Sequence, residues 1–150
     1  MRRNDKEIKD PAEIEQLLQK PVVCRIAIAD GNTPYIVPVN FAVEDGMLYV
    51  HSAKTGKKID ILRKNPLVCF EMDIPGDLVE GDTACRWGMK YKSLIGFGKA
   101  IFLESAEEKR KALDFLMKKY ARHSNFAYPD EALDKVLVIG IQIVSVSGKR

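Results

Sequence analysis

The chain has 150 residues, of which 46% are hydrophobic and 30% charged, with a formal net charge of +3 at pH 7. This composition is typical of a globular domain and argues against a disordered chain or a strongly basic nucleic-acid-binding protein. We expect one domain over residues 1–150 that buries its own core without metal or disulfide support.

The first third of the chain predicts a helix followed by two strands. Asp10 is a suitable N-cap, and Glu13 would close a capping box on a helix that ends before residue 21. The β-branched, apolar residues of 22–29 and 35–43 then predict strands. Pro38 lacks an amide donor, so its strand lies at a sheet edge, contains a bulge or faces a ligand.

The middle of the chain predicts a hairpin, a short helix and further strands. We expect a hairpin turn at residues 44–46, a strand over 47–52 and a helix over 57–64. A strand over 67–72 and a mobile loop over 74–84 should follow. Residues 85–103 are long for one straight strand, and we expect bends or bulges at Gly88, Gly96 and Gly98.

The last third predicts a helix and a closing strand. Ser105 and Glu108 form a second capping box before a helix that extends to about residue 120, and residues 136–146 are a hydrophobic strand. The total is six strands and three helices. Because most strand connections resemble hairpins, we expect a mainly β (α+β) fold, an antiparallel sheet closed into a small barrel.

The charge and thiol patterns limit the kinds of partner and metal site that we expect. Basic residues cluster at helical spacing and predict a solvated helix face rather than a nucleic-acid surface: Lys109, Arg110, Lys111, Lys118, Lys119 and Arg122. Cys24, Cys69 and Cys85 are far apart, and with His51 and His123 they form no zinc-binding spacing. We expect reduced thiols, no metal, no membrane association and a cytoplasmic protein, because no signal peptide or long apolar run is present.

The segment 49–58 carries the clearest chemical signal. A strand ends at His51 and Ser52, and Gly56 then precedes Lys57 and Lys58 at a helix start. Free amide groups and two ammonium groups at such a turn suit a terminal phosphate. A plain strand-to-helix turn with solvated lysines fits the spacing equally well.

No nucleophile–base set is evident. His51 and Ser52 are adjacent, so a strand would direct them to opposite faces. No Gly-rich dinucleotide turn, Walker sequence or carboxylate pair is present. If the protein is an enzyme, we expect the chemistry to reside in a cofactor.

Five motifs in order resemble a known family. They are residues 34–41 (PYIVPVNF), 49–53 (YVHSA), 56–58 (GKK), 91–100 (YKSLIGFGKA) and 107–109 (EEK). In this order they resemble the pyridoxamine 5'-phosphate oxidase-related FMN-binding proteins, and most of all the nitroimidazole-resistance branch. The resemblance extends from residue 2 to about residue 120.

The resemblance implies a six-stranded split β-barrel that forms a homodimer and holds FMN between the subunits. It implies that Lys57 and Lys58 bind the FMN phosphate and that His51 and Ser52 lie beside the ribityl chain and ring. It also implies flavin contacts from the strand Val37, Pro38, Val39 and Asn40 and from Tyr91 and Ser93. His51 would be the polar group next to the substrate.

Structural readings of these residues stay open. Pro38 fits an ordinary edge strand, and Tyr91 fits a core tyrosine whose hydroxyl reaches water. His51 fits a structural histidine, and His123 lies in a polar loop and fits a bystander. Trp87 suits either a ring-stacking role or a dimer surface.

The predicted activity is an FMN-dependent transfer of electrons from a reduced donor, such as NAD(P)H, to a small organic acceptor, such as a nitro compound. Pyridoxamine phosphate is not the expected substrate, because residues 142–150 lack the Arg-x-His ending of the vitamin-forming oxidases. The alternatives are a flavin store or sensor without turnover, and a haem-binding relative with His51 or His123 as axial ligand.

Overall fold

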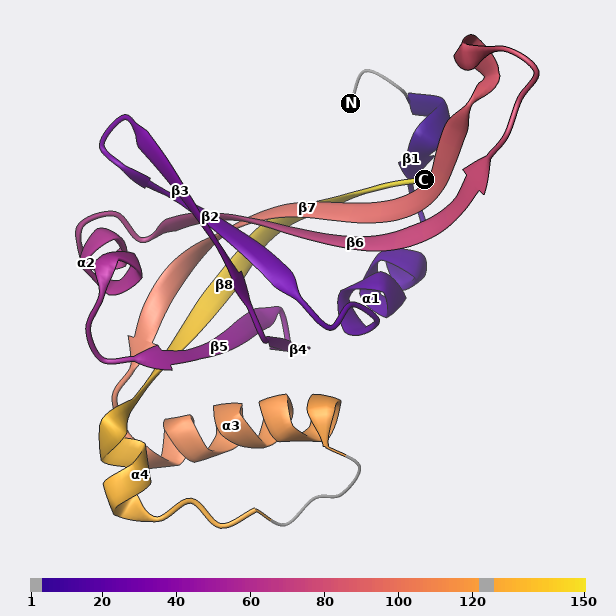
Figure 1. Ribbon diagram of the computed structural model, residues 1–150. Helices are drawn as coiled ribbons and strands as arrows, with labels where there is room; N and C mark the ends of the chain where they lie inside the picture. Colours follow the sequence, from indigo (N-terminus) through magenta and orange to yellow (C-terminus); the bar gives the residue numbers. More distant parts are fainter. Residues whose placement is uncertain (1–3, 122–125) are drawn as a thin grey trace.

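The structure, a computed structural model, describes residues 4–121 and 126–150 as an antiparallel sheet with helices around it (Figure 1). The strand order is β3-β2-β6-β7-β8-β5-β4, and β1 pairs with β8. The strands are β1 (Glu7–Ile8), β2 (Cys24–Asp30), β3 (Thr33–Val39), β4 (Ala42–Glu44), β5 (Met47–Ala53), β6 (Leu67–Val79), β7 (Gly88–Leu103) and β8 (Val136–Lys149). The helices are α1 (Pro11–Gln19), α2 (Lys57–Lys64), α3 (Ala106–Tyr120) and α4 (Asp130–Lys135), with 3-10 turns at Asn4–Lys6 and Ala84–Arg86.

The expected fold class is confirmed, since the curled, open antiparallel sheet with flanking helices is a split barrel. The predicted strand count of six is wrong, because the described residues form eight. The predicted strand 35–43 divides at Asn40 and Phe41 into β3 and β4. Strand β1 has only two residues, too few for a periodic pattern, and it exists because it pairs with the end of β8.

The predicted loop 74–84 is wrong over its first part. Strand β6 continues to Val79 and pairs with the start of β7, with Pro75 opposite Tyr91 and Leu78 opposite Met89. An irregularity between these two pairs accommodates the turn-forming Pro75 and Gly76. The result is a long hairpin arm that extends beyond the rest of the sheet (Figure 1).

The core lies on the concave side of the sheet. Alternate residues of the central strands are fully buried there, including Ile26, Phe70, Leu94 and Ile139. Of the bends or bulges predicted at three glycines, the one at Gly98 is confirmed by a register shift between Phe97 and Gly98. Gly96 stays in register with Phe70 and Val146, and Gly88 is simply the first residue of β7. At Gly96 an added Cβ would lie 2.1 Å from Cζ of Phe70, so the glycine makes room for that ring.

The helix caps are partly as expected. Asp10 Oδ1 accepts from the amide of Ala12 at 3.0 Å, and Ser105 and Glu108 form a complete capping box. The capping role predicted for Glu13 is wrong, because two distant cations draw its carboxylate away from the helix start.

The opposite face of the sheet is unusually apolar. We call the side of β3, β2, β6 and β7 that faces away from the core the outer face. It carries five large apolar side chains that are 40–65% exposed: Ile36, Leu67, Ile95, Phe97 and Ile101. A surface of this kind is typical of a contact with another molecule.

Two further observations concern the membrane and the thiols. In the part of the chain that the structure describes, no helix has the length and apolar character needed to cross a bilayer. Cys24 is buried, Cys69 half-buried and Cys85 exposed, and all three are free.

Candidate functional site

The turn at the start of α2 has the geometry that its sequence predicts. Gly56 has φ 128°, a value that favours glycine, and its carbonyl accepts from the amides of Ile59 and Asp60 at 2.9 and 3.1 Å. No side chain caps this helix. Only the amides of Lys57 and Lys58 therefore lack a partner within the helix, and together with the two ammonium groups they form an arrangement that attracts anions.

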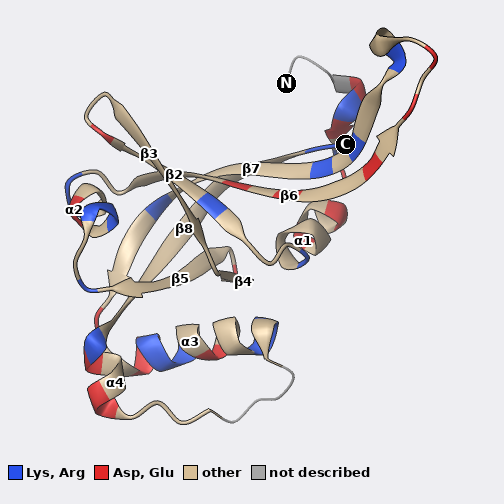
Figure 2. Ribbon diagram, viewed as in Figure 1, with Lys and Arg blue, Asp and Glu red and all other residues tan. Residues whose placement is uncertain are grey.

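The two lysines differ in environment. Lys57 is exposed, and its Nζ lies 5.0 Å from the centroid of the Tyr35 ring in β3. Lys58 is half-buried, and desolvation lowers the pKa of its amine. Figure 2 shows basic residues at this helix, and the Lys57–Tyr35 contact places the turn next to β3.

The four predicted residues Val37–Asn40 lie at an edge of the sheet. Strand β3 is the first in the strand order and pairs with β2, so the edge-strand reading of Pro38 is confirmed. Val37 and Val39 are half-buried on the core side, whereas Pro38 and Asn40 are exposed. The structure therefore brings this strand together with Lys57.

His51 and Ser52 lie on β5, opposite Val138 and Leu137 of β8. His51 is exposed and Ser52 is half-buried. Because neighbouring strand residues point to opposite faces, the two do not form a catalytic pair, as the sequence predicts. His123 falls outside the described residues, as do Arg122 and residues 1–3.

Tyr91 and Ser93 lie near the base of the hairpin arm. Ser93 is opposite Asp73 and Lys149, and the Tyr91 ring lies 5.6 Å from Nζ of Lys149. Both residues are half-buried. Tyr91 also lines a cavity of about 950 Å³.

One chain does not bring Tyr91 to the lysine turn. Pro38, Arg25, Glu71 and Ile95 are aligned across four strands. Tyr35 lies three residues to one side of this row and Tyr91 four residues to the other. At about 3.3 Å per residue, the two are about 23 Å apart along the strand direction, a span longer than FMN.

Sequence reasoning missed two ionic clusters, because each joins residues far apart in the chain. On the outer face, Nη1 of Arg25 lies 2.6 Å from Asp73 Oδ1 and 3.0 Å from Glu71 Oε2, and these bonds raise the pKa of the guanidinium. Arg25 is directly opposite Pro38, so it adjoins the predicted flavin strand.

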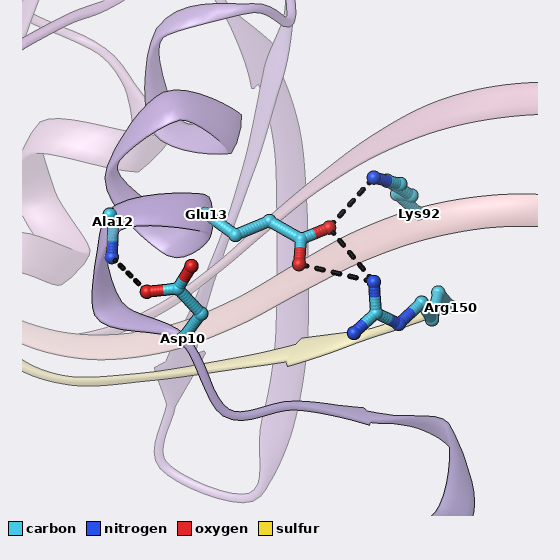
Figure 3. A network of polar contacts seen from close by, with 5 residues as sticks. All are labelled: Asp10, Ala12, Glu13, Lys92 and Arg150. Atoms are coloured by element: carbon cyan, nitrogen blue, oxygen red, sulfur yellow. Dashed lines mark hydrogen bonds and ion pairs between the residues drawn. The ribbon is translucent and has the colours of Figure 1, made fainter.

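The second cluster is centred on Glu13 of α1 (Figure 3). Its Oε1 accepts from Lys92 Nζ at 2.7 Å, and its Oε2 accepts from Arg150 Nη1 at 3.1 Å. The bond from Lys92 and the charges of both cations hold the pKa of the Glu13 carboxyl below its usual value, although desolvation opposes them. No local pattern in the sequence indicates this cluster.

A sequence comparison identifies the family to which this chain belongs. A profile described as pyridoxamine 5'-phosphate oxidase matches residues 10–150. The chain belongs to the pyridoxamine 5'-phosphate oxidase family. Within this family it is similar to a Bacteroides thetaiotaomicron VPI-5482 protein named a candidate 5-nitroimidazole antibiotic resistance protein, with 35% identity and a TM-score of 0.86 over 95% of this chain and 85% of that one. The resemblance to the nitroimidazole-resistance branch is thereby confirmed.

Two further solved structures share the fold. A FAD-binding protein from Mesorhizobium loti is 27% identical, with a TM-score of 0.68 and 93% of each chain covered. A FAD and heme binding protein from Mycobacterium smegmatis has a TM-score of 0.88 over 96% of this chain and 72% of that one, but at 17% identity it shows the fold alone. No curated protein matches the sequence significantly.

Proposed function

We propose that this family member binds FMN and is an FMN-dependent oxidoreductase. The observation that carries the proposal is the α2 turn, where uncapped amide groups and two lysines adjoin edge strand β3. The Mesorhizobium loti relative, named a FAD-binding protein, supports a flavin as the ligand. FAD would present a phosphate to the same turn, so the test must compare both flavins.

We assign Lys57 and Lys58 to the flavin phosphate. Lys58 is desolvated, and an anionic oxygen would recover the charge interaction that its ammonium has lost to burial. Lys57 is held at Tyr35 and therefore presents its charge beside β3. The open edge of β3, from Val37 to Asn40, would then follow the ring system.

The bound flavin would accept two electrons from a reduced donor such as NADH or NADPH and deliver them to a small acceptor such as a nitro compound. The residues of the chain would bind, orient and shield the reactants. His51 is exposed at the surface, so its imidazole is free to donate a hydrogen bond to a substrate oxygen.

In this proposal a second copy of the chain would complete the flavin site. A flavin on the lysine turn is too short to reach Tyr91 and Ser93 of the same chain. We therefore propose a homodimer in which the second copy supplies these two residues. The apolar outer face supports this arrangement, because its five exposed side chains would be buried against the partner.

The visible spectrum of purified protein, with and without added FMN or FAD, tests the proposal directly. We expect the bands of an oxidised flavin and their bleaching by NADH or NADPH without oxygen, followed by recovery on addition of a nitro compound. A bound flavin that neither donor bleaches would instead favour storage or sensing. A Soret band without a flavin band would contradict the proposal.

Mixed dimers test the shared site. Lys57→Ala/Lys58→Ala chains are refolded together with Tyr91→Ala/Ser93→Ala chains. Each variant alone should bind FMN weakly, whereas random mixing should restore about a quarter of all sites, one in each mixed dimer. If the mixture recovers no binding while each variant still dimerises, the two residue sets do not meet across the interface.

A further inference from the structure

The link between the two edge strands of the sheet is held by a side chain from α3. Strand β3 is first in the strand order and β4 is last, and only Asn40 and Phe41 join them. Phe41 is fully buried, so its backbone amide needs a partner inside the protein. That partner is the hydroxyl of Tyr120, the last residue of α3, at 3.0 Å. Helix α3 therefore holds the point at which the chain crosses from one edge of the sheet to the other.

The same hydroxyl also bonds to the strand that neighbours β3. It donates to the carbonyl of Val22 at 2.7 Å, two residues before β2 begins. In the β2–β3 ladder the last pair is Cys24 opposite Val39, so a ladder two residues longer would place Val22 opposite Phe41. The Tyr120 hydroxyl thus lies between two residues that are in line to pair with each other.

The alternation of the ladder shows what the hydroxyl replaces. Pro38 has no amide, so its pair with Arg25 is one without hydrogen bonds between the strands. Hydrogen-bonded and open pairs alternate along an antiparallel ladder, so a pair of Val22 with Phe41 would be hydrogen-bonded. The Tyr120 hydroxyl takes the place of this direct bond, accepting from the amide and donating to the carbonyl. It therefore bridges the two strands at the point where they separate.

Asn40 lies between the last paired residue of β3 and the bridged residue. Continued by one residue, the same alternation directs its backbone amide away from β2, toward the open edge that we assign to the flavin ring. Asn40 is exposed, whereas the next residue, Phe41, is fully buried and held on two sides. Its amide bonds to Tyr120, and Nζ of Lys119 lies 3.4 Å from the centroid of its ring. The end of α3 thereby fixes the residue that anchors Asn40.

We propose that Tyr120 is a positioning residue of the flavin site, whose hydroxyl sets the orientation of Asn40 at the open edge of β3. The hydroxyl uses its donor and an acceptor position at the same time, so it sets both the separation of the strand ends and the direction of the link. The role toward the flavin rests on the proposed function, whereas the bridge between the strands does not.

Tyr120→Phe removes the hydroxyl and keeps the ring, and titrations of the full-length variant with FMN and with riboflavin, which lacks the phosphate, test the role. We expect both dissociation constants to rise about fivefold, the factor that the loss of one neutral hydrogen bond to the ring would produce. The equal effect on both flavins distinguishes this change from Lys57→Ala/Lys58→Ala, which should weaken FMN alone. The matched control is Gln19→Met, which removes another side-chain bond to this region, from Nε2 to the carbonyl of Val43 at 2.9 Å, and should leave both affinities unchanged.

Amide hydrogen exchange in the protein without flavin tests the bridge by itself. The phenylalanine ring would still separate the strand ends, so the Phe41 amide should lose its partner and exchange about tenfold faster in Tyr120→Phe than in the wild type. An unchanged exchange rate would show that the hydroxyl is not the partner of this amide.

The two experiments also separate the positioning role from the proposed function. Wild-type flavin affinity in Tyr120→Phe, or a loss confined to FMN, would overturn the positioning role while flavin binding itself stood. A wild-type protein that bound neither flavin would instead refute the proposed function and the role with it, and the exchange rate of the Phe41 amide would still decide whether the bridge exists.

Discussion

Replacement of both lysines at the start of α2 should weaken FMN binding through the phosphate alone. Each charge-assisted contact contributes about 1.5–3 kcal/mol. Because Lys57 is exposed and Lys58 only half-buried, we take the lower value for each, a total of about 3 kcal/mol. Lys57→Ala/Lys58→Ala should therefore raise the Kd for FMN about 150-fold.

Riboflavin, which has the same ring and ribityl chain without the phosphate, is the internal control. Titrations that follow the quenching of flavin fluorescence should show riboflavin affinity changing less than threefold in the double variant. The matched control is Lys64→Ala, which removes an exposed lysine from the other end of α2 and should leave both affinities unchanged. Equal weakening of FMN and riboflavin would refute the phosphate assignment, because the lysines would then act on the ring or the fold.

Three further predictions concern stability. Gly96→Ala should lower the free energy of unfolding by about 1–3 kcal/mol, since its Cβ would overlap the Phe70 ring; thermal unfolding measures this, and an unchanged Tm would contradict it. Ser105→Ala removes the cap that accepts from the Glu108 amide and should cost about 1 kcal/mol in urea unfolding; an unchanged free energy of unfolding would show that helix α3 does not depend on its capping box. Burial lowers the pKa of Lys119 from 10.5 to about 8, so between these pH values the unfolded chain keeps a proton that the native state has released. The contribution of Lys119 to stability should rise across this window by about 1 kcal/mol after allowance for partial exposure, whereas buried Cys24, whose pKa is raised from 9.0 to about 12, acts in the opposite direction above pH 9. The stability of the wild-type protein relative to Lys119→Met should therefore grow by about 1 kcal/mol between pH 8 and pH 10.5, and a constant difference would contradict the assignment.

Local signals predicted those parts of the fold that local chemistry determines. The hairpin turn at 44–46 is confirmed by positive φ values at Asp45 and Gly46, and the bounds of α2 agree with the predicted residues 57–64. The extension of β6 into residues 74–79 was missed, since Pro75 and Gly76 are turn formers and only pairing with β7 makes the segment a strand.

The candidate site also combines features that adjacent residues predict with features that depend on packing between distant segments. Gly56, Lys57 and Lys58 are adjacent in sequence, so their anion-binding geometry could be predicted from residue types alone. The contact of Lys57 with β3 could not, because it depends on how α2 packs over the sheet. The grouping of Glu13, Lys92 and Arg150 depends on the position of α1 against β7 and β8, which no pattern in the sequence specifies.

The proline spacing of β3 limits how another chain can pair with this edge of the sheet. An exposed sheet edge offers a row of amide donors to which another chain can add a strand. A proline is tolerated in a strand where its nitrogen faces away from the neighbouring strand, so Pro34 and Pro38 remove two donors from the open edge. Between the two prolines, only Ile36 also has its backbone nitrogen directed away from β2. Residues 34–38 therefore offer a single amide donor to a strand that would add at this edge. Strand addition at this edge is therefore disfavoured, so the proposed second copy would contact the apolar face rather than extend the sheet into a fibre.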